Sequence, residues 1–276
     1  MSEHEDTRAA WDKIAPGYDR TNTVTQMWLA NEGLRRAGLQ RGMKFLDVAS
    51  GSGAVAIPAA RLGAQVTAVD QSSVMLEHLN ARAKKENLSV EARVMDAHSL
   101  QFPDNTFDMV GSQFGVMLLP DMPKAVREMA RVVKPGGKVL LHAYGNPHEI
   151  EFLGFLVMSV KSVRPDFDGP PMDPPPLEFQ LADPARVKSE LTAAGLKNVT
   201  VETITESTEF KSGKEVWEWI YWSNPIVEMV LSGMLGLSDA EKATVQGTID
   251  KMFRERAGSS GSMKLSNPIN IGIGTK

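Results

Sequence analysis

The sequence contains no cysteine, so disulfide bonds, thiolate metal ligands and cysteine nucleophiles are excluded together. Its five histidines include no HExxH-type pair, so we expect no zinc or other metal site. No apolar run approaches the roughly 20 residues that span a bilayer, and the charged N-terminal stretch has no signal-peptide core. These absences predict a cytoplasmic protein that does not span a membrane.

An excess of positive charge is also missing. The formal net charge is −4, the isoelectric point is near 5.8, and the basic residues are scattered along the chain. This composition argues against nucleic acid as the main partner. With 276 residues, of which 42% are apolar, the chain can form one large α/β domain or one domain with a cap.

Apolar runs alternate with helical patterns from residue 44 to about residue 144, which is typical of a doubly wound parallel sheet covered on both faces. The fold class is therefore α/β, with a Rossmann-like seven-stranded sheet. We expect strands at 44–49, 65–70, 90–95, 107–113, 138–143, 199–205 and 268–274. We expect helices at 7–18, 25–37, 54–62, 73–86, 122–132, 146–163, 184–194, 213–235 and 238–255.

Two insertions interrupt this alternation. Residues 146–182 combine an apolar stretch with the proline-rich sequence RPDFDGPPMDPPPLEF, which cannot form regular structure. Residues 208–262 contain Trp217, Trp219 and Trp222, which either face a pocket or pack the cap onto the sheet. The predicted organisation is an entrance segment at 1–40, a ligand-binding core at 41–145, cap or lid insertions at 146–182 and 208–262, and further core elements at 183–207 and 263–276.

The segment MKFLDVASGSGAVAIPAARLGAQVTAVD (43–70) places glycines between a predicted strand and a predicted helix. Gly51 and Gly53 can take positive φ and let a ligand approach the backbone closely. Asp70 ends the next strand, where its carboxylate can accept hydrogen bonds from both hydroxyls of a ribose. Together these features fit a loose dinucleotide-type fingerprint.

Asp47 indicates which kind of ligand such a loop could bind. It lies near the end of the first strand, two residues before the loop, and its negative charge would repel a pyrophosphate. The same charge favours a cationic group, or orients the N–H groups of the loop. The predicted ligand therefore has a positive charge and no phosphate.

Several motifs, in order, resemble those of class I S-adenosylmethionine-dependent methyltransferases. DVASGSG resembles their first motif, and VTAVDQSSVML resembles the second strand with its ribose-binding acid. RVMDAHSLQFPDNTFDMV and REMARVVKPGGKVLL are similar to the adenine-contacting segment and to the helix, turn and fifth strand. The stretches WDKIAPGYDRTNTVTQMW and QFGVMLLPD resemble the ubiquinone and menaquinone C-methyltransferases and their relatives. The resemblance covers about residues 10–145 and implies a sheet whose last strand is antiparallel.

The resemblance also implies which residues bind S-adenosylmethionine. Asp70 would hold the ribose, Asp96 would accept from the adenine amino group, and the Ala97 N–H would bond to the ring. Gln113 and Phe114 would border the sulfonium and the substrate. The complete set is Tyr18 over the cofactor, Asp47, Ala49 and Gly51 at its methionine part, Gly53 in the loop, Asp70, Gln71, Met75, Asp96, Ala97, Gln113 and Phe114.

The function implied by the resemblance is methyl transfer to a small or medium-sized, partly apolar molecule. The quinone enzymes have Arg-Asn where this chain has Met117-Leu118, which argues against a quinone acceptor. Whether oxygen, nitrogen, carbon or sulfur receives the methyl group stays open. If the acceptor must lose a proton, His142 and Tyr144 at the end of the fifth strand are the candidate bases.

Two other functions stay open at this point. The chain could be a catalytically silent S-adenosylmethionine-binding regulatory module, or an NAD(P)-dependent oxidoreductase that uses the same loop. Asp47 argues against the second of these, because a nicotinamide dinucleotide carries a pyrophosphate. A homodimer is compatible with the sequence.

Overall fold

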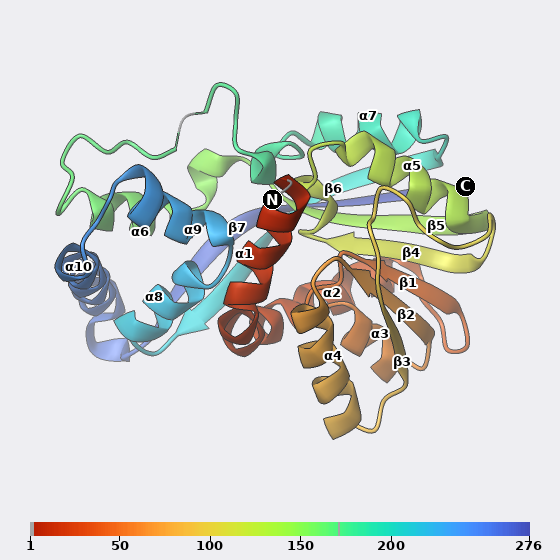
Figure 1. Cartoon of the computed structure of the whole chain (residues 1–276), viewed down its shortest axis with the longest axis horizontal. Helices are drawn as coiled ribbons and strands as arrows, with labels where there is room; N and C mark the ends of the chain where they lie inside the picture. Colours follow the sequence, from red (N-terminus) through yellow and green to blue (C-terminus); the bar gives the residue numbers. More distant parts are fainter. Residues whose placement is uncertain (1–2, 171) are drawn as a thin grey trace.

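The computed structural model describes residues 3–170 and 172–276, and it is built around one seven-stranded sheet (Figure 1). The strand order is β3-β2-β1-β4-β5-β7-β6, and β7 is antiparallel to both of its neighbours while the other pairs are parallel. The predicted fold class is confirmed. The strands are β1 (Lys44–Val48), β2 (Gln65–Asp70), β3 (Val90–Val94), β4 (Phe107–Gln113), β5 (Val133–Tyr144), β6 (Lys197–Phe210) and β7 (Met263–Thr275).

Helices cover both faces of the sheet, as a doubly wound fold requires. Helices α2, α3 and α4 pack on one face, and α5 and α7 pack on the other (Figure 1). Helix α1 crosses in front of the sheet at the boundary with the cap, and α6, α8, α9 and α10 form the cap. Their bounds are α1 (Glu3–Tyr18), α2 (Val24–Ala37), α3 (Ala56–Arg61), α4 (Ser73–Lys85), α5 (Met122–Val132), α6 (Glu151–Val160), α7 (Pro184–Ala193), α8 (Gly213–Tyr221), α9 (Pro225–Glu228) and α10 (Asp239–Ala257).

The central strands are buried on both faces, which explains their nearly continuous apolar sequences. Phe45, Leu46 and Val48 of β1 have no exposed surface. Helix α5 begins where the Asp121 carboxylate accepts a hydrogen bond from the N–H of Lys124. Its apolar residues then recur on one side and pack against β4 and β5.

The last two strands are longer than predicted, and their extra length carries the cap. β6 and β7 pair from Lys197 to Phe210, whereas β5 pairs with β7 only as far as Tyr144. The sequence expectation ended early because the outer part of β6 alternates with polar residues. Glu206 and Thr208 lie on its buried side, so their polarity hides the strand pattern.

Two predicted helices are interrupted by proline. The expected helix at 213–235 is divided into α8 and α9, because Asn224 caps a new helix that begins at Pro225. The helix expected at 146–163 shortens to α6, since Pro147 begins a separate 3-10 turn. Within the described part of 164–176, the proline-rich stretch contains neither helix nor strand.

Candidate functional site

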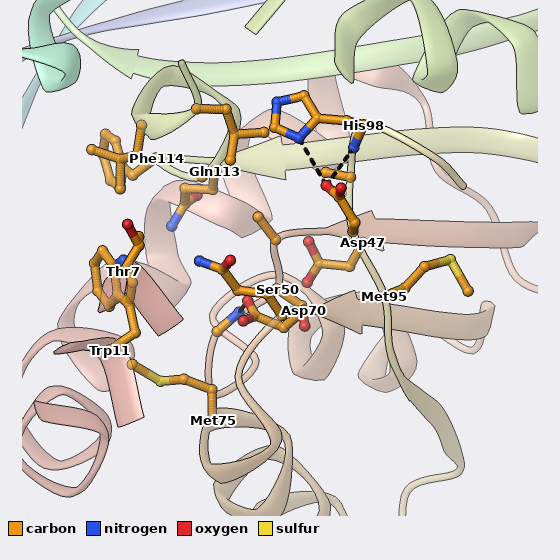
Figure 2. Close-up of a pocket in the computed structure, with 18 of the residues that line it drawn as sticks. Thr7, Trp11, Asp47, Ser50, Asp70, Met75, Met95, His98, Gln113 and Phe114 are labelled. Atoms are coloured by element: carbon orange, nitrogen blue, oxygen red, sulfur yellow. Dashed lines mark hydrogen bonds and ion pairs between the residues drawn. The ribbon is translucent and has the colours of Figure 1, made fainter. Parts of the chain in front are cut away.

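A cavity of about 430 Å³ lies at the carboxyl ends of β1, β2 and β4 (Figure 2). All of the predicted cofactor-binding residues except Gly53 line it. The structure therefore brings together residues from five separate stretches of the sequence. The lining includes Thr7, Trp11 and Tyr18 from α1; Asp47, Ala49, Ser50 and Gly51 from β1 and its loop; Asp70, Gln71 and Met75 from β2 and α4; Met95, Asp96, Ala97 and His98 after β3; and Gln113, Phe114, Gly115, Leu118 and Leu119 after β4.

The loop after β1 turns sharply at three residues with positive φ. Ala49, Gly51 and Gly53 have φ values of 53°, 52° and 98°. Gly51 faces the cavity, and the nearest atom to a Cβ placed there would be Cε1 of Tyr18 at 3.7 Å. Gly53 instead packs away from the cavity, where a Cβ would lie 3.1 Å from Ile57 and Leu79. Gly53 therefore shapes the loop without lining the cavity.

Asp47 presents a partly unsatisfied carboxylate to the cavity. The side chain is 1% exposed, and its Oδ2 accepts a hydrogen bond from the N–H of Ala56 at 2.8 Å. Its Oδ1 and the neighbouring Ser50 Oγ are buried without a partner among the described residues. Burial raises the pKa of the Asp47 carboxyl well above its ordinary value. These atoms fit a ligand that brings a cationic donor into the loop.

Asp70 connects the two turns that frame the cavity. Its Oδ2 accepts the Gly51 N–H at 2.8 Å, and its Oδ1 accepts the Ser72 N–H at 2.9 Å. Each oxygen keeps a lone pair for a further donor, because a carboxylate offers about four acceptor positions. Burial raises the pKa of this carboxyl as well. The geometry suits the predicted ribose contact and adds a structural role that the sequence did not reveal.

The segment after β3 forms another wall of the cavity. Asp96 Oδ1 accepts the N–H of His98 at 2.9 Å and lies 2.8 Å from the Nδ1 of the same residue. Met95 and Ala97 of this segment are buried and line the cavity. These two interactions between Asp96 and His98 hold the turn at the edge of the sheet, where the predicted contacts of Asp96 and Ala97 with adenine require it.

A second cavity, of about 410 Å³, lies between the sheet edge and the cap. It shares Trp11, Tyr18, Phe114 and Leu118 with the first cavity, so the two chambers meet at one wall. Its remaining lining is mostly apolar. It includes Met117, Tyr144, Ile150, Phe152, Leu153, Leu156, Val157, Phe167, Glu178, Phe179, Ile226, Val227 and Val230.

Phe114 and Tyr144 stack where the two cavities meet. Their ring centroids are 4.5 Å apart with an interplanar angle of 16°. Phe114 holds a φ of 57°, which is strained for a bulky residue. The following residue is glycine because a Cβ there would lie 2.5 Å from Cβ of Ala49. The loops after β1 and β4 are therefore pressed together beneath the shared wall.

The two candidate bases occupy different places. Tyr144 lines the second cavity, and burial raises the pKa of its phenol well above the ordinary value. His142 lines neither cavity; its ring packs against α2, where a Cβ on Gly33 would lie 2.1 Å from Nε2. Its Nδ1 lies 2.8 Å from Oε1 of Gln113, and burial lowers its pKa to about 3. This placement suits a residue that orients Gln113.

The cap tryptophans belong to the packing of the cap. Trp217, Trp219 and Trp222 line neither cavity. Trp219 is 2% exposed and meets the rings of Phe152 and Phe210 at centroid distances of 5.3 and 5.8 Å. Of the two interpretations left open by the sequence, the packing one describes Trp219, whereas Trp222 packs on α1, where a Cβ on Gly17 would lie 2.2 Å from its ring.

Several lining residues were missed from the sequence. Ser50 stands between the predicted Ala49 and Gly51, and Trp11 and Leu118 lie in stretches that resemble the quinone enzymes, so the resemblance could have pointed to them. Glu178 belongs to an insertion without a recognisable motif, and only the folded chain brings it to the site. No group of three or more acidic or histidine side chains in the described part of the chain is arranged to hold a metal ion. None of the described helices is both long enough and apolar enough to cross a membrane.

Comparisons with known proteins agree with this geometry. Residues 46–141 match the family model described as a methyltransferase domain. The chain is 35% identical over 156 residues to the ubiquinone/menaquinone biosynthesis C-methyltransferase of Bdellovibrio bacteriovorus, covering 52% of this chain and 66% of that protein. It is 36% identical over 129 residues to an uncharacterised protein of Mycobacterium tuberculosis, covering 47% and 46%.

A solved structure shares the same architecture. Phosphoethanolamine N-methyltransferase 2 of Haemonchus contortus, solved with phosphomonomethylethanolamine and S-adenosylhomocysteine, superimposes with a TM-score of 0.54 at 25% identity. The match covers 90% of this chain and 52% of that one. This chain also spans about half the length of the mycobacterial proteins that it matches. Residues 46–141 match a methyltransferase domain, and the chain has the fold of class I S-adenosylmethionine-dependent methyltransferases, as its motifs predicted.

Proposed function

We propose that the protein transfers a methyl group from S-adenosylmethionine to a small, partly apolar acceptor. The observation that carries this proposal is the pair of cavities that meet at Trp11, Tyr18, Phe114 and Leu118. The donor would occupy the first cavity and the acceptor the second. The shared wall is where the reacting atoms would meet, since in-line transfer needs both in contact and aligned.

The residues of the first cavity fit the donor in charge and in hydrogen-bonding capacity. The free Oδ1 of Asp47 would accept from the amino group of its methionine part, and Asp70 would accept from the ribose hydroxyls. Asp96 and Ala97 would hold the adenine, while Met75 packs beside it. When bound, S-adenosylmethionine would supply an electrophilic methyl group on its sulfonium.

On the acceptor side, the protein's contribution is alignment and exclusion of water. The stacked Phe114 and Tyr144 rings and Phe152 form an apolar surface beside the shared wall. Because the pKa of Tyr144 is raised, its hydroxyl keeps its proton and would act as a hydrogen-bond donor. His142 would position Gln113 from outside the cavity.

This function also gives the predicted organisation of the chain a physical basis. Residues 41–145 would form the donor-binding core, and α1 in the entrance segment would close over it. The insertions would supply the acceptor chamber. Both cavities are lined by a single copy of the chain, so the proposal does not require a dimer.

Two measurements test the proposal against its alternatives. Titration calorimetry with S-adenosylmethionine, S-adenosylhomocysteine and NAD should give binding of the first two and none of the third. Incubation with a panel of acceptors should release S-adenosylhomocysteine. NAD binding at the first cavity would favour an oxidoreductase, whereas donor binding without turnover across a broad panel would favour a silent regulatory module.

A further inference from the structure

The charges around the second cavity are of one sign. No lysine or arginine is found among the described residues that line it, whereas four carboxylate residues are: Glu149, Glu151, Asp168 and Glu178. A lining without a lysine or arginine offers no cationic side chain to pair with an anionic ligand.

Three of the four carboxylates are already occupied or exposed. Glu151 pairs with Arg256 at 2.7 Å and also accepts the Ser266 N–H. Asp168 pairs with Lys161 at 2.7 Å and its side chain is 86% exposed. Glu149 is exposed and accepts from Asn146 at 2.9 Å. Only the fourth carboxylate remains available inside the chamber.

Glu178 is that fourth group, and its position is fixed. It lies in the 3-10 turn Leu177–Phe179, and the next residue, Gln180, donates hydrogen bonds to the carbonyls of Met117 and Leu119 at 2.8 and 3.0 Å. No cation in the described part of the chain pairs with the Glu178 carboxylate, although the side chain is only partly exposed and burial raises its pKa. Its own backbone N–H donates a hydrogen bond to this carboxylate, so a cation to balance its charge would come from the ligand.

We propose that the acceptor is a lipophilic amine, with an apolar body in the second cavity and an ammonium group that binds at Glu178. The Glu178 carboxylate would take up one proton from this group, so that the nitrogen lone pair can form the new bond to the methyl carbon as the carbon–sulfur bond of the donor breaks. The inference rests on the proposed function, because it identifies the molecule that would fill the acceptor chamber. The apolar body would contact the aromatic and aliphatic walls. The positive charge of the ammonium group would balance the negative charge of the Glu178 carboxylate, which has no cationic partner in the described part of the chain. Carboxylates and phosphate esters of the same size would be rejected.

Three probes with one skeleton separate charge from shape: 2-phenylethylamine, 2-phenylethanol and phenylacetate. Their binding to the full chain is measured by ligand-observed NMR and by calorimetry, with and without S-adenosylhomocysteine. We expect the amine to bind at least tenfold more tightly than phenylacetate and at least threefold more tightly than the alcohol. Glu178→Gln should reduce the preference for the amine over the alcohol to less than twofold.

Glu149→Gln is the matched control, because it removes an equivalent carboxylate from the same cavity at an exposed position. It should leave the order of the three probes unchanged. Equal binding of the amine and the alcohol, binding of phenylacetate at amine-like affinity, or an amine preference that survives Glu178→Gln would overturn the inference. If S-adenosylhomocysteine binds while the amine preference is absent, the acceptor class is wrong and the methyltransferase function stands. If S-adenosylhomocysteine fails to bind, the proposed function itself fails.

Discussion

The two cavities are similar in size, but they are built in different ways. The first is lined mainly by short loops that follow parallel strands, so most of its residues are positioned by the sheet. The second is lined mainly by helices and turns from two long insertions. Residues in the first are therefore positioned by backbone geometry, and residues in the second by packing within the cap. A change in the cap should alter stability and the binding of a ligand in the second cavity, while leaving the first cavity intact.

The largest effect is expected at the centre of the cap. Trp219→Ala removes a side chain that is 2% exposed and donates from Nε1 to Thr25 at 3.0 Å. The free energy of unfolding should fall by about 3–5 kcal/mol, measured by chemical denaturation. Trp28→Ala, at a position 41% exposed, serves as the control and should cost much less. If Trp219→Ala instead keeps its stability and only weakens acceptor binding, the residue belongs to the chamber and the comparison breaks down.

The second prediction uses pH to probe the strand extension that carries the cap. Burial raises the pKa of Glu206 from 4.5 to about 7. The folded state therefore holds this proton more tightly than the unfolded state, and the free energy of unfolding loses this contribution as pH rises from about 4.5 through 7. Glu206→Gln removes the cost of ionising a buried carboxyl. Its stability relative to the parent chain should rise between pH 5 and pH 8, by about 3 kcal/mol at most.

Thermal and denaturant melts at the two pH values measure this difference. Glu209→Gln, on an exposed part of the same strand, should show no such dependence. A constant difference between Glu206→Gln and the parent chain would mean that this carboxyl does not titrate in the range.

The third prediction concerns the first cavity. Asp70→Ala should weaken S-adenosylhomocysteine binding at least tenfold, because charge-assisted hydrogen bonds contribute roughly 1.5–3 kcal/mol each. The variant also releases the N–H groups of Gly51 and Ser72, so a modest loss of stability should accompany the loss of affinity. Asp108→Ala removes a carboxylate at the opposite end of the sheet, where it accepts from Lys44 and Lys134. Calorimetry should find its affinity unchanged; equal losses in both variants would indicate general destabilisation.

The smallest effect is expected at His142. Burial lowers the pKa of this imidazole to about 3, so it is neutral throughout the range in which the enzyme would be assayed. His142→Asn should reduce turnover by less than about tenfold. Loss of a general base would reduce it by at least about 100-fold, because general acid–base catalysis contributes that much or more. The pH profile between 6 and 8 should keep its shape. An inflection near pH 6.5 that disappears in the variant would make His142 the base.

The sequence was informative wherever backbone geometry and residue type are tied together. The turn after β1 needs residues at positive φ, and Asp70 must end the neighbouring strand to meet the Gly51 N–H, so a short motif encodes a three-dimensional arrangement. The same reasoning placed the central strands of the sheet to within a residue or two. Among these central strands β5 is the exception: it begins at Val133 and not at residue 138, because its first part, with Gly136, pairs irregularly with β4.

The cap could not be predicted in the same way. Glu178 and Phe152 are 26 residues apart in different elements and converge only through packing. Trp219 is of a residue type that often lines pockets, yet it packs against Phe152 and Phe210 in the core of the cap. His142 ends a strand at the correct edge of the sheet but faces α2, and the single observation that decides this is its contact with Gly33.

Ala49 and Phe114 have a bearing on engineering the chain for heat resistance. Both are non-glycine residues with positive φ, at 53° and 57°, and such backbone conformations cost about 1–2 kcal/mol each. A search for stabilising substitutions would therefore be drawn to these two positions, where glycine relieves the strain. Both line the first cavity, and Phe114 also lines the second. Glycine at these positions would loosen the loops that line both cavities, and ligand binding would weaken as stability rises. A thermostable design should therefore keep both residues and strengthen the cap.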